Sequence, residues 1–297
     1  ARTQNKAFKN ITALFETANA VLWMGMETGK LAVFHHEEFN SIKTDTFNIE
    51  VPVTDILQDT RGRIWIATYG QGILLKEGNS FLLLNDQNGL KDNFVYDLEL
   101  GPEGDVWAGT DAGIAICSLE EQTPETLIID TRSGLPDIII TCLKKDQYNN
   151  MLIGMQDAGI CYYDFEKDHI AMIDMMKKWR FGTVTSLIPA GENIWIGTSG
   201  EGIISYHPEK ERFNQYINII QNKSFFQVND MMACVEGNYW IASGNELIIS
   251  PGEKFEFFHT YRGIDFSNPL ALHADKENNL WFSTERGLYR YRGTGQK

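Results

Sequence analysis

Cysteine is scarce in this 297-residue chain, which has only four. No two of them form a CxxC pair, so the sequence indicates neither a zinc site nor a disulfide framework. Each lies within an apolar, strand-like run, such as "GIAICS" or "MMACV". We therefore expect four small buried thiols, at Cys117, Cys142, Cys161 and Cys234.

Basic residues are also few, because 26 Lys and Arg stand against 40 Asp and Glu, for a formal net charge of −14. Nucleic acids and anionic membrane surfaces bind clustered Lys and Arg, so we expect neither as a partner. No uncharged apolar run approaches the roughly 20 residues of a membrane-spanning helix. The chain begins at Ala1 rather than at a methionine, and we expect it to be a processed or excised piece.

Motifs of catalysis and metal binding are missing as well. The sequence has no GxSxG, HExxH or P-loop string. Among its six histidines only His35 and His36 are adjacent, and we interpret this pair as surface residues. Acidic residues are plentiful, but the paired carboxylates of a glycosidase cannot be recognised from spacing. We therefore expect no enzymatic activity, no catalytic residue, no metal and no cofactor.

An internal repeat is what the sequence does have. Six tryptophans recur in similar contexts: Trp23, Trp65, Trp107, Trp195, Trp240 and Trp281. Leu152 takes the same place in a seventh copy. With Leu152 included, the spacings are 42, 42, 45, 43, 45 and 41 residues. Twelve residues before this anchor, six of the seven units open a strand-like run, and five of these six begin it with a β-branched residue. Seven units of about 43 residues therefore fill the chain.

Each unit is predicted to form four short strands. In the second unit these are "VTDIL", "RIWIAT", "GILLKE" and "SFLLLN", joined by turns rich in Gly, Asn and Asp. Four-stranded antiparallel units with a period of roughly 40 to 45 residues are typical of a β-propeller. We therefore predict an all-β fold, a single seven-bladed propeller domain of four-stranded antiparallel blades over residues 1–297.

Ring closure and blade packing follow from this prediction. The last unit ends after its third strand, so we predict that residues 6–10 supply the outer strand of blade 7. The indoles are expected to fill the space between adjacent blades. In blade 4, where Leu152 replaces the indole, we expect Met151, Met155 or Met172 to occupy that volume.

The repeated phrase is clearest in "DTRGRIWIATYGQGI", "GPEGDVWAGTDAGI" and "DKENNLWFSTERGLYRY". It resembles the two-component regulator propeller repeat over essentially the whole chain. The resemblance implies the periplasmic sensor region of a hybrid two-component histidine kinase, typically from polysaccharide-degrading gut bacteria. Such sensors commonly carry two propellers, an immunoglobulin-like domain, a membrane helix and a kinase. With one propeller, this chain would be a fragment of a sensor or a stand-alone relative.

The loops of one propeller face are the expected ligand site. They connect the second strand to the third within a blade, and each outer strand to the next inner strand. An oligosaccharide or another small ligand is expected there, because aromatic rings suit pyranose faces and arginines donate to hydroxyls or carboxylates. Trp179 is the only tryptophan outside the repeat register. It could stack on a sugar ring, or it could be a loop residue that covers an outer strand. The candidate ligand-binding residues are Trp179, Arg180, Tyr69, Phe226, Tyr261, Arg262 and Phe266.

Acidic residues also recur on the inner strands, at Asp55, Asp97 and Asp230. We expect them to reach backbone amides through water rather than to bind a cation. Two other classes of function stay open. One is a carbohydrate-active lyase or glycosidase on a propeller scaffold, and the other is a propeller that binds a protein partner or dimerises.

Overall fold

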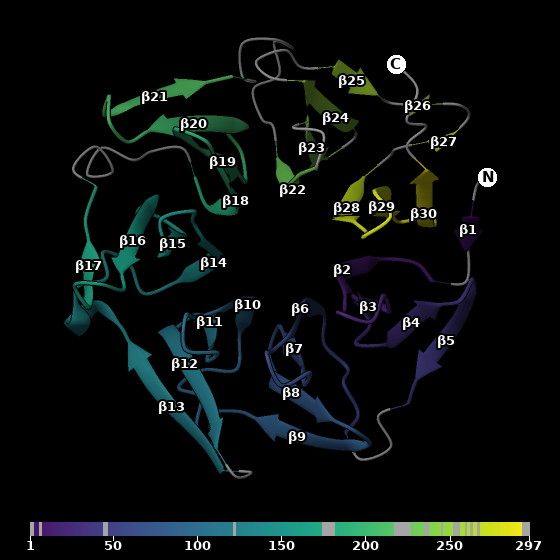
Figure 1. Cartoon of the computed structure of the whole chain (residues 1–297), viewed down its shortest axis with the longest axis horizontal. Helices are drawn as coiled ribbons and strands as arrows, with labels where there is room; N and C mark the ends of the chain where they lie inside the picture. The colour runs from purple at the N-terminus through teal and green to yellow at the C-terminus, as the bar shows by residue number, and fades with distance from the viewer. Residues whose placement is uncertain are drawn as a thin grey trace.

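The structure, a computed structural model, confirms the seven-bladed β-propeller (Figure 1). It describes residues 3–5, 8–43, 47–120, 123–173, 182–216, 227–234, 238–244, 246–251, 256–258, 260–261, 264–265 and 268–292. These residues form seven four-stranded sheets around an axis, one two-stranded ribbon and one short 3-10 helix.

Blades 1 to 3 take their strands in chain order, from the axis of the ring to its rim (Figure 1). Blade 1 contains β2 (Ile11–Glu16), β3 (Leu22–Met26), β4 (Leu31–His35) and β5 (Glu38–Ile42). Blade 2 contains β6 (Val53–Gln58), β7 (Ile64–Thr68), β8 (Gly72–Glu77) and β9 (Ser80–Leu84). Blade 3 contains β10 (Val95–Leu100), β11 (Val106–Thr110), β12 (Gly113–Glu120) and β13 (Thr123–Ile129), and the helix η1 (Thr131–Ser133) follows it.

Blades 4 to 6 repeat the same order. Blade 4 contains β14 (Ile140–Lys145), β15 (Asn150–Met155), β16 (Ile160–Asp164) and β17 (His169–Ala171). Blade 5 contains β18 (Val184–Ala190), β19 (Asn193–Thr198), β20 (Ile203–His207) and β21 (Arg212–Gln215). Blade 6 contains β22 (Val228–Ala233), β23 (Asn238–Ser243), β24 (Glu246–Pro251) and β25 (Glu256–Phe258), and the ribbon β26 (Thr260–Tyr261) and β27 (Ile264–Asp265) follows it.

Blade 7 contains strands from both ends of the chain. Its inner strands are β28 (Pro269–Ala274), β29 (Asn279–Thr284) and β30 (Gly287–Arg292), and β1 (Thr3–Asn5) pairs antiparallel with β30. Closure by an N-terminal strand is thus confirmed, but its expected position at residues 6–10 is wrong. Phe8 already packs on Phe39 of β5, with ring centroids 5.7 Å apart, so the chain has left the edge of blade 7 by that residue.

Deleting residues 1–5 tests this closure. The deletion removes β1 and leaves the outer edge of β30 unpaired, so we expect the melting temperature to fall by several degrees. Replacing the three residues of β1 by alanine keeps its backbone hydrogen bonds and should lower the melting temperature less. Calorimetric melting of the three proteins makes the comparison, and equal melting temperatures would show that β1 does not stabilise the ring.

The acidic residue of the repeat shapes the turn between the first two strands of a blade. In blade 2, Asp59 Oδ1 accepts a hydrogen bond from the Arg63 N–H at 2.9 Å. Asp59 Oδ2 accepts another from the Trp65 indole N–H, also at 2.9 Å. Blade 7 repeats the indole bond between Asp275 and Trp281 at 2.8 Å. One carboxylate therefore sets the turn and fixes the orientation of the tryptophan.

The Thr and Gly that follow the tryptophan form the next turn. The Thr68 hydroxyl donates to the Gly72 carbonyl at 2.7 Å and accepts from the Gln71 N–H at 3.2 Å. Gly72 has a φ of 82°, and a Cβ atom there would lie 2.1 Å from the Leu84 carbonyl oxygen. Glycine is therefore required at this position, where the chain is left-handed and the outer strand approaches closely.

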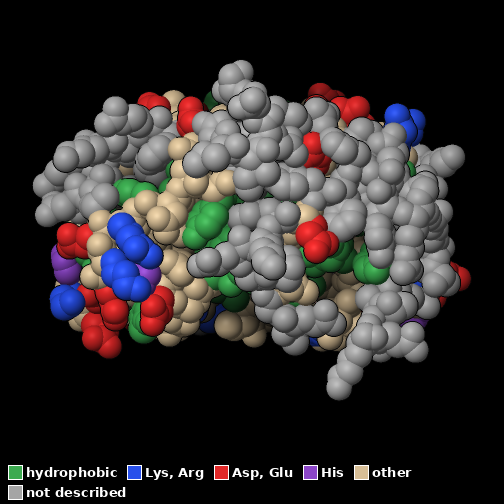
Figure 2. Space-filling model, turned by 90° about the horizontal axis from the view of Figure 1, so that it is seen from above, with side chains coloured by type: hydrophobic (Ala, Val, Ile, Leu, Met, Phe, Trp, Pro, Cys, Tyr) green, Lys and Arg blue, Asp and Glu red, His purple; other side chains and the backbone are tan. Residues whose placement is uncertain are grey.

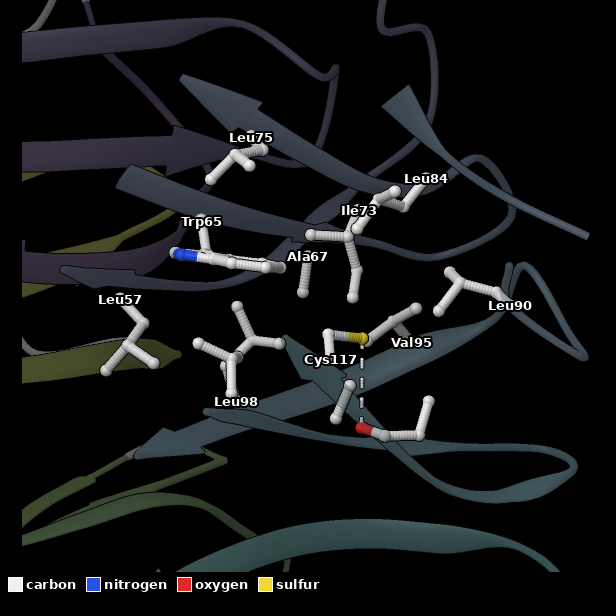
Figure 3. Packing of buried hydrophobic residues seen from close by; sticks show 13 residues of the cluster. Leu57, Trp65, Ala67, Ile73, Leu75, Leu84, Leu90, Val95, Leu98 and Cys117 are labelled. Atoms are coloured by element: carbon white, nitrogen blue, oxygen red, sulfur yellow. Dashed lines mark hydrogen bonds between the residues drawn. The ribbon is translucent and has the colours of Figure 1, made fainter. Parts of the chain in front are cut away.

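The hydrophobic core is divided among the blade junctions. The described residues form seven clusters, and each cluster joins two neighbouring blades. Figure 3 shows the junction of blades 2 and 3, where Trp65 lies above Leu98 of β10 and near Cys117 of β12. Trp65 is fully buried, as expected for an indole that fills the space between two sheets.

The cysteines are free thiols, and three of the four are buried as expected. Burial raises the pKa of Cys117 and of Cys161 to about 12, so both remain protonated at neutral pH. The expectation is wrong for Cys234, which is only partly buried. Cys234 directly follows β22, and its N–H donates to the Asn238 carbonyl at 2.8 Å.

Trp65→Ala tests the packing role of the indole. Removing a fully buried indole leaves a cavity at the junction of blades 2 and 3, so the free energy of unfolding should fall by about 3 to 5 kcal/mol. Tyr148→Ala is a control at a highly exposed turn residue and should change it by less than about 0.5 kcal/mol. Urea denaturation measures both, and similar values for the two variants would contradict the packing role.

Candidate functional site

The structure places two of the seven predicted ligand residues. Tyr69 follows β7, and its side chain is described. Tyr261 lies in β26, where only the backbone is described. The other five predicted residues, Trp179, Arg180, Phe226, Arg262 and Phe266, lie outside the described residues. For these five the assignment stays a prediction.

Tyr69 lies at the junction of blades 2 and 3, beside the starts of two inner strands. Its backbone N–H donates to the Pro52 carbonyl, one residue before β6, at 2.9 Å. It also forms an isolated β-bridge with Phe94, one residue before β10. The inner strands surround the axis of the ring (Figure 1), so these contacts place Tyr69 near the axis, on the expected loop face.

Tyr69 belongs to a small aromatic group that we call the Tyr69 cluster: Tyr69, Phe94, Tyr96 and Asp111. The Tyr69 ring meets the Phe94 ring edge to face at 4.8 Å and the Tyr96 ring at 5.6 Å. Tyr69 is 42% exposed and Phe94 38%, whereas Tyr96 is half-buried. Two exposed rings, one of which also contacts the half-buried Tyr96, offer aromatic surface on which a flat apolar ligand surface can stack.

Polar groups border this platform. The Tyr96 hydroxyl donates to Asp111 Oδ1 at 2.8 Å. Burial, and then the charge of Asp111, raises the pKa of Tyr96 well above its ordinary value, so the hydroxyl keeps its proton. Within the described residues, Asp111 Oδ2 accepts no hydrogen bond. The cluster therefore combines a stacking surface with a carboxylate oxygen that can accept from a ligand hydroxyl.

Tyr69 was expected from the sequence, whereas Phe94 and Tyr96 were not. A signal for Tyr96 is present, because the second residue of an inner strand usually bridges to the next blade. Thr54 donates to the Val95 carbonyl at 2.7 Å, and Thr141 donates to the Val184 carbonyl at 2.6 Å. Tyr96 occupies this second position in β10 and turns instead toward Asp111. The signal in the sequence is a large aromatic residue at a position where threonine stands in blades 1, 2, 4 and 5.

The third residues of the inner strands hold neighbouring blades together. Each inner strand has a β-bulge between its first residue and its third or fourth. Three aspartates there accept hydrogen bonds from the next blade: Asp55 from the Leu98 N–H (3.0 Å), Asp97 from Leu143 (2.7 Å) and Asp230 from Leu272 (2.8 Å). The contacts are direct, so the expectation of water-bridged contacts is wrong. The bulge brings each carboxylate within bonding distance of the adjacent strand.

Burial makes these carboxyl groups reluctant to ionise. Desolvation raises the pKa of Asp55 and of Asp97, and the negative charge of Asp97 raises that of Asp55 further. Burial raises the pKa of Asp230 to about 7, although the N–H groups of Leu272 and Met231 favour its charged form. In the described part of the chain, no group of three or more His, Cys, Asp and Glu side chains is arranged to hold a metal ion.

Asp230→Ala tests the bridging role. The substitution leaves two backbone N–H groups without their acceptor, so the free energy of unfolding should fall by about 1 to 3 kcal/mol at pH 5. The pKa of Asp230 is raised to about 7, above its unfolded value, so its contribution is full below about pH 4 and is lost as pH rises through 7. The cost should therefore be smaller at pH 8.

Ser186→Ala is the matched control for this prediction, because Ser186 is the third residue of the inner strand β18. We expect a change of less than about 0.5 kcal/mol at either pH. Denaturant titrations at pH 5 and pH 8 measure both variants. An Asp230→Ala protein as stable as the Ser186→Ala protein would refute the bridging role, and a cost that grows with pH would refute the raised pKa.

The family comparison confirms the resemblance to the two-component regulator propeller. The sequence model of that family matches residues 49–70, the segment that contains Trp65 and ends beside Tyr69. The comparison with curated proteins finds no match. Within the described residues, no helix is both long enough and apolar enough to cross a membrane.

Solved structures with the same fold include extracellular domains of two-component systems. The extracellular domains of two hybrid two-component systems from B. thetaiotaomicron superpose with TM-scores of 0.79 and 0.78, at 17% and 19% identity. They match 100% and 97% of this chain, which spans only 40% and 41% of theirs. Virginiamycin B lyase from Staphylococcus aureus has a TM-score of 0.75 at 12% identity, over 98% of this chain and 97% of its own. At these identities the likeness establishes the fold.

Proposed function

We propose that this chain is a non-catalytic, ligand-sensing propeller of a two-component sensor, that it functions in the periplasm, and that its ligand is an oligosaccharide. The family match at residues 49–70 and the similarity to extracellular domains of hybrid two-component systems support the sensor role. The observation that carries the ligand proposal is the Tyr69 cluster.

The chemistry of this cluster suits a sugar. Pyranose rings present apolar C–H faces that stack on aromatic rings, and Tyr69 and Phe94 are both more than one-third exposed. Sugar hydroxyls are donors, and Asp111 offers a carboxylate acceptor beside the rings. Trp179 and Arg180, on the connection between blades 4 and 5, are the further residues that we propose for the same ligand face.

Charge favours a neutral oligosaccharide. The chain carries a formal net charge of −14, which repels acidic polymers. In the edge-on view of Figure 2, the described Lys and Arg side chains lie among Asp and Glu side chains and form no continuous basic surface. A neutral glycan should therefore bind more tightly than a sulfated glycan of the same length, and the difference should shrink as salt is added.

A lyase is the alternative from another class, because virginiamycin B lyase shares the fold over nearly its whole length. In this chain Asp55, Asp97 and Asp230 already bind backbone N–H groups of neighbouring blades. This engagement favours a structural use of the acidic residues on the inner strands. Incubation with polysaccharides, followed by an assay for new reducing ends, distinguishes an enzyme from a binding domain.

Alanine substitutions in the Tyr69 cluster test the proposal. Against the tightest ligand of a panel of neutral oligosaccharides, Tyr69→Ala and Phe94→Ala should each weaken binding roughly three- to tenfold, since each removes one stacking surface. Both residues are exposed, so the free energy of unfolding should change by less than about 1 kcal/mol. Trp179→Ala should weaken binding as well. Isothermal titration calorimetry measures affinity, and thermal melting verifies folding.

Tyr148→Ala is the control, because Tyr148 is 72% exposed and lies on the turn between β14 and β15, away from the loops of the proposed face. Glycan affinity should not change in this variant. Unchanged affinity in the Tyr69, Phe94 and Trp179 variants would place the ligand elsewhere on the molecule. Failure of every glycan in the panel to bind would refute the carbohydrate proposal.

A further inference from the structure

Blade 7 shows the complete set of side-chain hydrogen bonds that holds the indole of the repeat. Asp275 Oδ2 accepts two side-chain hydrogen bonds, one from Asn279 Nδ2 and one from the Trp281 indole N–H, both at 2.8 Å. The indole itself is 1% exposed and packs in the core cluster shared with blade 1. Carboxylate, amide and indole thus act together at the junction of two blades.

Blade 4 keeps the carboxylate and the amide of this arrangement but lacks the indole. Asp146 and Asn150 have the same spacing as the pair in blade 7, and Asn150 Nδ2 donates to Asp146 Oδ2 at 3.0 Å. The indole position, two residues further on, is occupied by Leu152. Within the described residues, Asp146 Oδ2 therefore accepts one hydrogen bond where its counterpart accepts two.

A cavity of about 560 Å³ opens at this place, between blades 4 and 5. Asp146 and Leu152 line it from blade 4, and Ile194 and Tyr206 line it from blade 5. Leu152 is 1% exposed and belongs to the core cluster of the same junction. The cavity thus adjoins the position that an indole fills in most other blades.

Methionine does not fill this volume, contrary to expectation. Met151 and Met155 are fully buried in the cluster between blades 3 and 4, on the opposite face of β15 from Leu152. Successive side chains of a strand point to opposite faces, so neither can replace the missing indole. Met172 lies on the cavity wall but is 46% exposed.

The polar wall of the cavity is acidic. Five carboxylate residues line it: Asp146, Asp164, Glu192, Glu209 and Glu211. Among the described residues, no Lys or Arg lines it. Lys167 pairs with Asp164 at 2.7 Å, and His207 lies 3.2 Å from Glu192. The remaining wall includes aromatic and aliphatic side chains, such as Tyr148, Tyr162 and Ile173, together with the amides Gln147, Asn150 and Asn193.

We infer that this cavity binds a small organic cation with a flat aromatic body, an arylalkylamine whose ring carries an N–H donor. The aromatic body takes the place of the missing indole beside Leu152, where apolar and tyrosine side chains surround it. Its ring N–H donates to Asp146 Oδ2, as Trp281 donates to Asp275. Its ammonium group lies among the glutamates of the wall, which attract a positive charge.

This site is separate from the Tyr69 cluster and does not rest on the proposed glycan function. It is built from the turns β14–β15 and β18–β19 and from residues after β20, whereas the Tyr69 cluster is built from the junction of blades 2 and 3. The two sites share no residue. Variants at one site therefore leave the other as an internal control.

Three related probes test the ligand class by isothermal titration calorimetry in low salt. Tryptamine should bind with one site per chain. Phenethylamine should bind more weakly because it lacks the ring N–H, and indole-3-acetic acid should bind at least about tenfold more weakly than tryptamine because its carboxylate is repelled. If tryptamine does not bind, or if the acid binds as tightly as tryptamine, the inference is overturned.

Leu152→Trp tests the location, because it places an indole where the aromatic body of the ligand is proposed to lie. The variant should keep or raise the melting temperature and lose tryptamine binding. Glycan binding at the Tyr69 cluster should remain. A folded Leu152→Trp protein that binds tryptamine with unchanged affinity would overturn the assignment.

A second variant covers the case in which Leu152→Trp does not fold. The double substitution Glu209→Gln and Glu211→Gln removes two negative charges from the exposed part of the cavity wall. It should lower tryptamine affinity at least about threefold. The double substitution Glu77→Gln and Glu103→Gln also removes two exposed charges, at residues outside the cavity wall, so it is the charge-matched control and should leave tryptamine affinity unchanged. Equal effects of the double variant and the control would attribute binding to net charge and overturn the site.

Discussion

The burial of apolar surface between neighbouring blades is the constraint on which this structure depends. A four-stranded blade cannot bury both of its faces alone, and the core is accordingly divided into one cluster per junction. In blades 2 and 7 the indole of the repeat is the largest fully buried side chain, and a turn carboxylate accepts a hydrogen bond from its N–H. The two ends of the chain must meet the same packing requirement, because the junction of blades 7 and 1 must be as well packed as the others. Closure by β1 brings the two ends together in blade 7.

Polar contacts near the axis complement this packing. The bulged inner strands bring threonine hydroxyls and aspartate carboxylates within direct reach of the backbone of the next blade. Each such bond satisfies a backbone group that the sheets leave unpaired near the axis. The acidic residues are therefore tied to the architecture, and burial raises their pKa values.

Both proposed sites include a residue that departs from the repeat. Tyr96 stands in a position that threonine holds in blades 1, 2, 4 and 5, and it contacts the exposed Tyr69 ring and bonds to Asp111. Leu152 stands in a position that tryptophan holds elsewhere, and an acidic cavity adjoins it. A repeat position freed from its structural bond can serve another partner, and each proposed site includes one such position, Tyr96 in one and Leu152 in the other.

The sequence by itself determined the number of blades, the strand order and the location of the core indoles, because a 43-residue period with one anchor per unit leaves few ways to bury the pattern. It also indicated closure by the N-terminus and the loop face of Tyr69. It could not give the three-residue strand Thr3–Asn5, the direct aspartate bridges or the grouping of Tyr69 with Phe94 and Tyr96, because these depend on bulges and on contacts between adjacent units. The cavity beside Leu152 likewise depended on the tertiary structure. Strand alternation directs Met151 and Met155 to the other face of β15, and only the packing of blade 5 against blade 4 decides whether a missing side chain leaves space.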